Sequence, residues 1–232
     1  MVGSPLLVQA APNALVCLDK ATGKELWRRT HHVGNLATNS LAARLDGIMD
    51  DVGEWHRLAW QHGATNTAQQ ARARLPKHIP VPGLESYNGD FLVCTTPCSD
   101  GRRVVAVFPT GIAAAYDLDG SLLWNKDLRP PAVRPENAPK SVEWARLSHF
   151  VSTCPVMTEE GIAVVAYGAQ VAGIEAASGK ALWTDWMPAT VGSPTVGRIG
   201  GESFLALPDF DILRVRDGLK VHDDPNPPHG DC

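Results

Sequence analysis

A short pattern repeats three times along the chain, and its fixed positions leave little freedom in the local backbone. Each copy has an apolar strand, an acidic residue, a short turn with a glycine, and a tryptophan that follows that glycine at a constant spacing. The copies lie at residues 15–27, 112–124 and 171–183. Self-similarity of this kind is typical of folds built from one repeated supersecondary unit, so the repeat dominates the interpretation of the chain.

The fixed residues of the pattern are suited to a tight hairpin. The acid ends a buried strand, where its carboxylate can accept hydrogen bonds from the amides of the turn. The glycine supplies a positive φ, and the tryptophan on the next strand can fill space between adjacent sheets while its N–H finds an acceptor. The predicted motif residues are Asp19, Gly23, Trp27, Asp117, Gly120, Trp124, Glu175, Gly179 and Trp183.

One position in the strand before the acid is always small. Cys17, Ala115 and Gly173 occupy it. A residue without a large side chain here indicates that a neighbouring backbone or sheet packs closely against the strand.

The segments upstream of the pattern also repeat. A small residue followed by proline stands before a short strand, a glycine-containing turn and a second strand. The dipeptides are Thr96-Pro97, Cys154-Pro155 and Ser193-Pro194, and the second strands are expected at Val104–Phe108, Ile162–Ala166 and Ser203–Leu207. Short strands with frequent turns in a four-strand unit predict an all-β fold, a β-propeller of four-stranded antiparallel blades.

The pattern of strand, acid, glycine and tryptophan resembles the PQQ-like (pyrroloquinoline-quinone-type) repeat of the quinoprotein alcohol dehydrogenase-like superfamily. The resemblance covers residues 3–30 and 91–221. It implies a β-propeller, and it is shared by quinone-dependent dehydrogenases and by non-catalytic propellers such as the outer-membrane assembly lipoprotein. It also implies a periplasmic or extracytoplasmic location, although residues 1–14 lack the basic region of a signal peptide.

The repeats divide the chain into blades and one insert. We expect an incomplete first blade at 1–30, a helical insert and linker at 31–90, a second blade at 91–130, a linker and third blade at 131–190, and a partial fourth blade and tail at 191–232. The fourth repeat, residues 212–221, keeps the strand and the glycine but has no tryptophan. About three and a half blades are fewer than closed propellers have. We therefore expect a fragment of a larger propeller; a small closed ring and a multi-chain assembly are the alternatives.

The insert has the periodicity of helices. Apolar residues recur at steps of three and four, the spacing of one helix face. They are Leu41, Leu45, Ile48, Val52, Trp55 and Leu58. A second helix is expected from Thr67, where Thr67-x-x-Gln70 fits a capping box, and it should end before Pro76. We expect the apolar face to pack on the propeller; presentation to a partner is the alternative.

Composition excludes several functions for the sequence as given. Its 232 residues carry a net charge of -4 with acids and bases intermixed, so no basic face for nucleic acid is expected. No apolar run approaches the roughly 20 residues of a membrane span. The five cysteines are an odd number at irregular spacing and predict no disulfide framework.

Candidate chemical groups are explained better by structure than by catalysis. Cys94 and Cys98 lack the second pair that a metal knuckle needs, and Cys154 fills the small position before proline. The Asp117–Gly120 stretch aligns with the hairpin turns rather than with a calcium loop. Seven of the eight histidines are scattered over the insert, the linkers and the tail and suggest no triad; they are His31, His32, His56, His62, His78, His149 and His229.

These observations predict a non-catalytic propeller that acts as a protein-binding or scaffold module. The alternative is a fragment of a PQQ-dependent dehydrogenase, which by resemblance would need a catalytic aspartate, a calcium site and often a vicinal disulfide. No residue can be assigned to those roles, and no Cys-Cys pair occurs. PQQ and calcium are expected only under that alternative. A carbohydrate-binding propeller is a third option, and it would require exposed rather than buried repeat tryptophans.

Overall fold

The computed structural model describes the blades and part of the insert. The described residues are 6–11, 13–31, 51, 54, 55, 57, 58, 65–74, 95–109, 111–128, 153–167, 170–186, 193–207 and 211–222. Within this part, no helix is both long and apolar enough to cross a membrane.

Four antiparallel sheets account for the described strands, and each sheet is a meander of consecutive strands. The first contains β1 (Leu6–Ala11), β2 (Ala14–Leu18) and β3 (Glu25–Thr30). The second contains β4 (Cys98–Ser99), β5 (Arg103–Val107), β6 (Ile112–Asp117) and β7 (Leu122–Asp127). The third contains β8 (Val156–Met157), β9 (Ile162–Tyr167), β10 (Gln170–Glu175) and β11 (Ala181–Trp186). The fourth contains β12 (Thr195–Ile199), β13 (Glu202–Ala206), β14 (Ile212–Arg214) and β15 (Lys220–His222).

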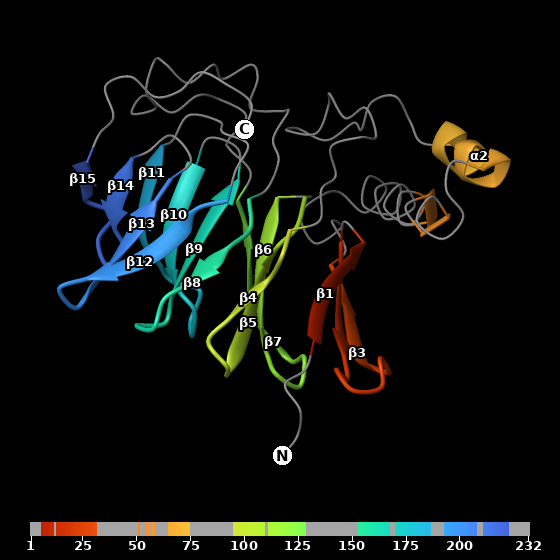
Figure 1. Cartoon of the computed structure of the whole chain (residues 1–232), viewed down its shortest axis with the longest axis horizontal. Helices are drawn as coiled ribbons and strands as arrows, with labels where there is room; N and C mark the ends of the chain where they lie inside the picture. Colours follow the sequence, from red (N-terminus) through yellow and green to blue (C-terminus); the bar gives the residue numbers. More distant parts are fainter. Residues whose placement is uncertain are drawn as a thin grey trace.

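The sheets stand side by side in chain order, from the red first sheet to the blue fourth sheet (Figure 1). Each sheet is one blade, so the predicted all-β propeller architecture with four-stranded antiparallel blades is confirmed; the first blade has three described strands, and the other three have four. The predicted second strands are present within one residue at each end, at β5, β9 and β13.

Apolar side chains pack between successive blades and form three layers. Leu15 of the first blade packs with Val104 and Tyr116 of the second. Val105 and Ile174 belong to the layer between the second and third blades. The third layer joins blades three and four. The middle strands are apolar on both faces because each of their faces meets a neighbouring blade.

The second helix of the insert is α2 (Asn66–Arg74). The predicted capping box at Thr67 is wrong, because Thr67 lies inside the helix. The cap is Thr65 instead, whose hydroxyl oxygen accepts a hydrogen bond from the Ala68 amide at 3.3 Å. The side chain of the residue just before a helix can reach the free amides of the first turn. Thr67 is the second residue of α2 and therefore does not occupy the capping position.

Part of the first helical stripe lies outside the described residues, including Leu41, Leu45, Ile48 and Val52. The remaining two, Trp55 and Leu58, are helical and pack with Ala68 and Ala71 of α2. In the described part of the insert, these apolar residues form a small cluster of their own that contains no blade residue.

Candidate interaction surfaces

Trp124 shows how neighbouring blades are joined. It lies on β7 of the second blade and is 8% exposed. Its indole Nε1–H donates a hydrogen bond to the Ala176 carbonyl of the third blade at 2.9 Å. The same ring covers Gly179, where a Cβ atom would lie 2.7 Å from Trp124 Cγ. One side chain therefore buries a large apolar area, satisfies its donor and requires glycine on the adjacent turn.

The other two repeat tryptophans form the same contacts one blade before and one blade after. Trp27 donates to the Leu118 carbonyl at 2.9 Å and covers Gly120. Trp183 donates to the Val215 carbonyl at 2.5 Å and covers Gly218. We call each set of indole, covered glycine and carbonyl acceptor an indole joint; the described blades have three, one at each interface.

The acids of the repeat stabilise the turns. Asp19 Oδ1 accepts hydrogen bonds from the Thr22 hydroxyl at 2.7 Å and the Thr22 amide at 2.8 Å, and these bonds lower the pKa of Asp19. Asp117 Oδ1 accepts a bond from the Ser121 amide at 2.7 Å. The Asp117–Gly120 stretch is a hairpin turn, closed by the Gly120 amide and the Asp117 carbonyl.

The small position in the strand has a different cause from the one expected. Cys17, Ala115 and Gly173 each stand directly opposite the tryptophan of the same blade in the strand register. A Cβ atom on Gly173 would overlap the Trp183 indole. At Gly173, the tryptophan side chain on the next strand therefore leaves no room for a larger residue.

The small residues before proline also connect the blades, which sequence reasoning missed. The Thr96 amide donates to Cys154 Sγ at 3.2 Å, and the Cys154 amide donates to Ser193 Oγ at 3.4 Å. The second and third blades thus each bond to the corresponding residue of the next blade. Cys98 is half-buried nearby, and burial raises the pKa of its thiol to about 12, so it is protonated at neutral pH. Cys94 lies outside the described residues.

His31 is buried between the first two blades, where sequence reasoning expected a linker residue. It is 7% exposed, and its Nε2 shares a hydrogen bond with the Tyr116 hydroxyl. Its ring centre lies 4.9 Å from that of Phe108. Burial raises the pKa of Tyr116, so the phenol is neutral. The predicted histidines His32, His56, His62, His78, His149 and His229 lie outside the described residues.

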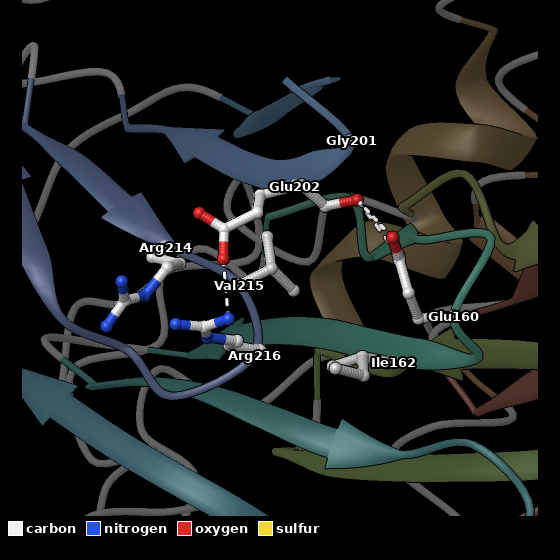
Figure 2. A pocket seen from close by; sticks show the side chains of 8 residues that line it. Glu160, Ile162, Gly201, Glu202, Arg214, Val215 and Arg216 are labelled. Atoms are coloured by element: carbon white, nitrogen blue, oxygen red, sulfur yellow. Dashed lines mark hydrogen bonds and ion pairs between the residues drawn. The ribbon is translucent and has the colours of Figure 1, made fainter. Parts of the chain in front are cut away.

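A small hollow of about 200 Å³ opens between the third and fourth blades. Figure 2 shows its charged lining, with Arg216 paired to Glu202 and Glu160 held by a hydrogen bond. The Arg216–Glu202 distance is 2.5 Å, and the Ser203 hydroxyl donates to Glu160 at 2.9 Å. Arg216 pairs with Glu202, Arg214 pairs with Asp217, and Glu160 accepts a bond from a hydroxyl, so each charged side chain of the lining is already engaged within the protein.

Metal-ligating side chains do not gather in the described blades and helices. Among those residues, no three His, Cys, Asp or Glu side chains lie close enough to hold a metal ion.

Comparison with known proteins agrees with this architecture. A family model described as outer membrane protein assembly factor BamB matches residues 57–207. The chain belongs to this family. Its repeat is therefore of the predicted PQQ-like type. No curated protein matches the sequence.

Two solved structures are similar to the chain to different degrees. BamB from Moraxella catarrhalis is 14% identical, with a TM-score of 0.51, and the match covers 99% of this chain and 51% of that one. The chain therefore spans about half the length of that BamB family member. The quinohemoprotein alcohol dehydrogenase ADHIIG from Pseudomonas putida HK5 is 13% identical, with a TM-score of 0.48, over 94% of this chain and 32% of that one.

Proposed function

We propose that this chain is a non-catalytic propeller module that binds protein partners, with a scaffolding role in outer membrane protein assembly of the kind named for its family. The repeat acids favour this role over chemistry, since Asp19 and Asp117 are engaged in turn hydrogen bonds.

The observation that carries the proposal is a row of exposed apolar side chains on the outer strands. The residue just before each repeat tryptophan is exposed: Leu26 by 54%, Leu123 by 42% and Leu182 by 41%. Val221 holds the corresponding place in the fourth blade and is 49% exposed. We call these four residues the rim row. Its repetition in every blade distinguishes it from apolar residues scattered singly over a surface.

The rim row lies on strands that have an open edge. Among the described strands, β3, β7, β11 and β15 are terminal in their sheets, and each is paired on one side only. An edge strand offers free backbone donors and acceptors to an added strand, and neighbouring apolar side chains add buried area. An extended segment of a partner protein therefore fits this surface.

Photo-crosslinking tests the proposal. A benzophenone amino acid placed at Leu26, Leu123 or Leu182 of the full chain, expressed in its host, should link to the same partner protein. The matched control is Thr67, which is exposed on α2 of the insert rather than on a blade. Linking from Thr67 as strongly as from the rim would contradict the proposed surface.

The dehydrogenase alternative makes the opposite prediction. A quinone-dependent enzyme would bind PQQ and calcium in stoichiometric amounts and reduce a dye with simple alcohols or sugars. We expect neither result from the full chain. Dye reduction that depends on added PQQ would overturn the proposed function.

A further inference from the structure

Three hairpin turns of the described blades contain an aspartate directly before a glycine. The pairs are Asp100–Gly101, Asp119–Gly120 and Asp217–Gly218, and the φ angles of their glycines are +80°, +81° and +71°. In such a pair the glycine amide nitrogen can attack the aspartate side-chain carboxyl, because glycine has no side chain to hinder the approach. The attack closes a succinimide ring, and it requires a carboxyl group that can turn toward the amide.

Hydrogen bonds and ion pairs hold two of the three carboxylates in place. Asp100 Oδ1 accepts a bond from the Arg103 amide at 2.7 Å, and Asp100 Oδ2 pairs with the Arg103 guanidinium at 3.0 Å. Asp217 Oδ1 accepts bonds from Arg214 Nε at 3.0 Å and from the Leu219 amide at 3.2 Å, and Asp217 Oδ2 pairs with Arg214 at 2.6 Å. Either carboxylate must break these bonds before it can turn toward its glycine.

The same bonds keep both carboxyl groups ionised. The hydrogen bond from Arg214 lowers the pKa of Asp217 to about 2. Partial burial opposes the shift at Asp100, but hydrogen bonds from the Arg102 and Arg103 amides lower the pKa of that carboxyl as well. Closing a succinimide expels a carboxyl oxygen as water, which leaves far more readily from the protonated acid than from the carboxylate. A lowered pKa therefore makes the reactive form rarer.

Asp119 differs from the other two. It is exposed on the turn between β6 and β7, and its carboxylate has no hydrogen bond or ion pair in the described part of the chain. The amide that it would meet is held no more firmly than in the other turns. The Gly120 amide donates to the Asp117 carbonyl at 3.1 Å, whereas the Gly218 amide donates to the Arg214 carbonyl at 2.8 Å. The carboxyl side of the pair, rather than the amide side, distinguishes Asp119.

We propose that Asp119–Gly120 is a site of spontaneous isoaspartate formation, selected among the three described Asp–Gly pairs by its unrestrained carboxyl group. The Gly120 nitrogen bonds to Asp119 Cγ, and a carboxyl hydroxyl leaves as water with the amide proton. One water then hydrolyses the succinimide at the Asp119 backbone carbonyl. Gly120 is left joined to the side-chain carbonyl, and Asp119 has a free α-carboxylate. The reaction is a net isomerisation, and its product is a methyl acceptor for an isoaspartyl methyltransferase that uses S-adenosylmethionine.

The modification site lies within the indole joint between the first and second blades. The Trp27 ring covers Gly120, where a Cβ atom would lie 2.6 Å from Trp27 Cδ2. Trp27 also donates to the Leu118 carbonyl at 2.9 Å, and Arg29 Nε donates to the Gly120 carbonyl. Isoaspartate adds a methylene group to the backbone between Leu118 and Gly120, so both sets of contacts cannot be kept unchanged. The isomerised chain should therefore have a loosened first joint, whether or not the rim row binds a partner.

Ageing of the full chain in mildly acidic buffer tests the proposal. Trypsin places the three pairs on separate peptides, and electron-transfer dissociation identifies isoaspartate in each. Isoaspartate should accumulate at Asp119 about tenfold faster than at Asp100 or Asp217, since breaking a hydrogen bond to a charged group lowers the reactive population by about that factor. Accumulation at Asp119 no faster than at the other two would overturn the proposal. Asp46–Gly47 and Asn88–Gly89 lie outside the described residues, and their fragment ions are scored separately.

Two variants test why Asp119 is selected. Arg214→Leu removes the main partner of Asp217, while Asp119 in the same molecule serves as the internal reference. The ratio of isoaspartate at Asp119 to that at Asp217 should fall several-fold, and an unchanged ratio would overturn the assigned cause. Asp119→Glu is the matched control, because it keeps the charge but its longer side chain does not readily close the ring. Its peptide should contain no isomerised form.

A second measurement places the modification in the joint. The isomerised chain, separated by ion exchange and labelled with ¹⁵N, should show a shifted Trp27 indole N–H resonance, whereas the Trp124 and Trp183 resonances should stay in place. Among the three peptides, methylation by a purified isoaspartyl methyltransferase should be confined to the one that contains Asp119. An unmoved Trp27 resonance, or methylation of all three peptides to the same extent, would contradict the inference.

Discussion

Replacing Gly179 with alanine should destabilise the chain more than the same replacement at Gly161. Both glycines lie on the third blade at positive φ, +73° and +78°. An alanine in this backbone region costs about 1–2 kcal/mol at either site. At Gly179 the added methyl would also lie 2.7 Å from Trp124 Cγ, whereas at Gly161 it would meet nothing within 4 Å.

The second contribution sets the difference between the two variants. Forcing a methyl group into a packed contact typically costs about 1–3 kcal/mol. The expected loss in unfolding free energy is therefore about 2–5 kcal/mol for Gly179→Ala and about 1–2 kcal/mol for Gly161→Ala. With a urea m-value of about 3 kcal/mol per molar, the midpoints of the two variants should differ by about 0.3–1 M.

Urea unfolding followed by far-UV circular dichroism measures both midpoints. Tryptophan fluorescence adds a local signal, since displacement of Trp124 from Gly179 should shift its emission in the native state of Gly179→Ala only. Equal midpoints for the two variants would refute the view that the indole stacked on the turn, rather than the backbone angle alone, requires glycine there.

Three further variants, one in the third blade and two in the fourth, test contacts within single blades. Gly173→Ala would place a methyl group against the Trp183 indole and should cost about 1–3 kcal/mol in unfolding free energy, whereas Gly197→Ala, with open space at its Cβ, should change it by less than about 0.5 kcal/mol. The hydrogen bond from Arg214 lowers the pKa of Asp217 to about 2, so the stabilisation that the Asp217 carboxylate provides should be complete above about pH 4 and be lost as the pH falls toward 2. In Arg214→Leu, an NMR titration should show the pKa of Asp217 rise to the ordinary aspartate range. An unchanged pKa would contradict the assigned cause.

The repeat and its hairpins could be predicted because they depend on residues a few positions apart. The spacing of Gly179 and Trp183 alone indicates a turn followed by a strand with an inward-facing ring. The acceptor of each indole could not be predicted in the same way. Ala176 is 52 residues from Trp124 in sequence, and nothing in an alanine marks its carbonyl as a partner.

Three other features could not be predicted from the sequence for similar reasons. His31 follows the first repeat and gives no sign that it is buried against Tyr116, because that contact joins two blades across the insert. The small size of Gly173 has a visible cause only once the strand register places Trp183 opposite it. The sequence pattern predicts the helix cap at Thr67, two residues after the actual cap at Thr65, because Thr67-x-x-Gln70 also fits a capping box.

The indole joints have a consequence for how such a chain can change over evolutionary time. Every interface between the described blades uses the same three groups, so a blade inserted or deleted as a unit would find compatible neighbours on both sides. Stability then grows by a similar increment with each blade added, as in other arrays governed by nearest-neighbour coupling. Duplication of the gene segment for one blade would extend the array without any new interface having to arise.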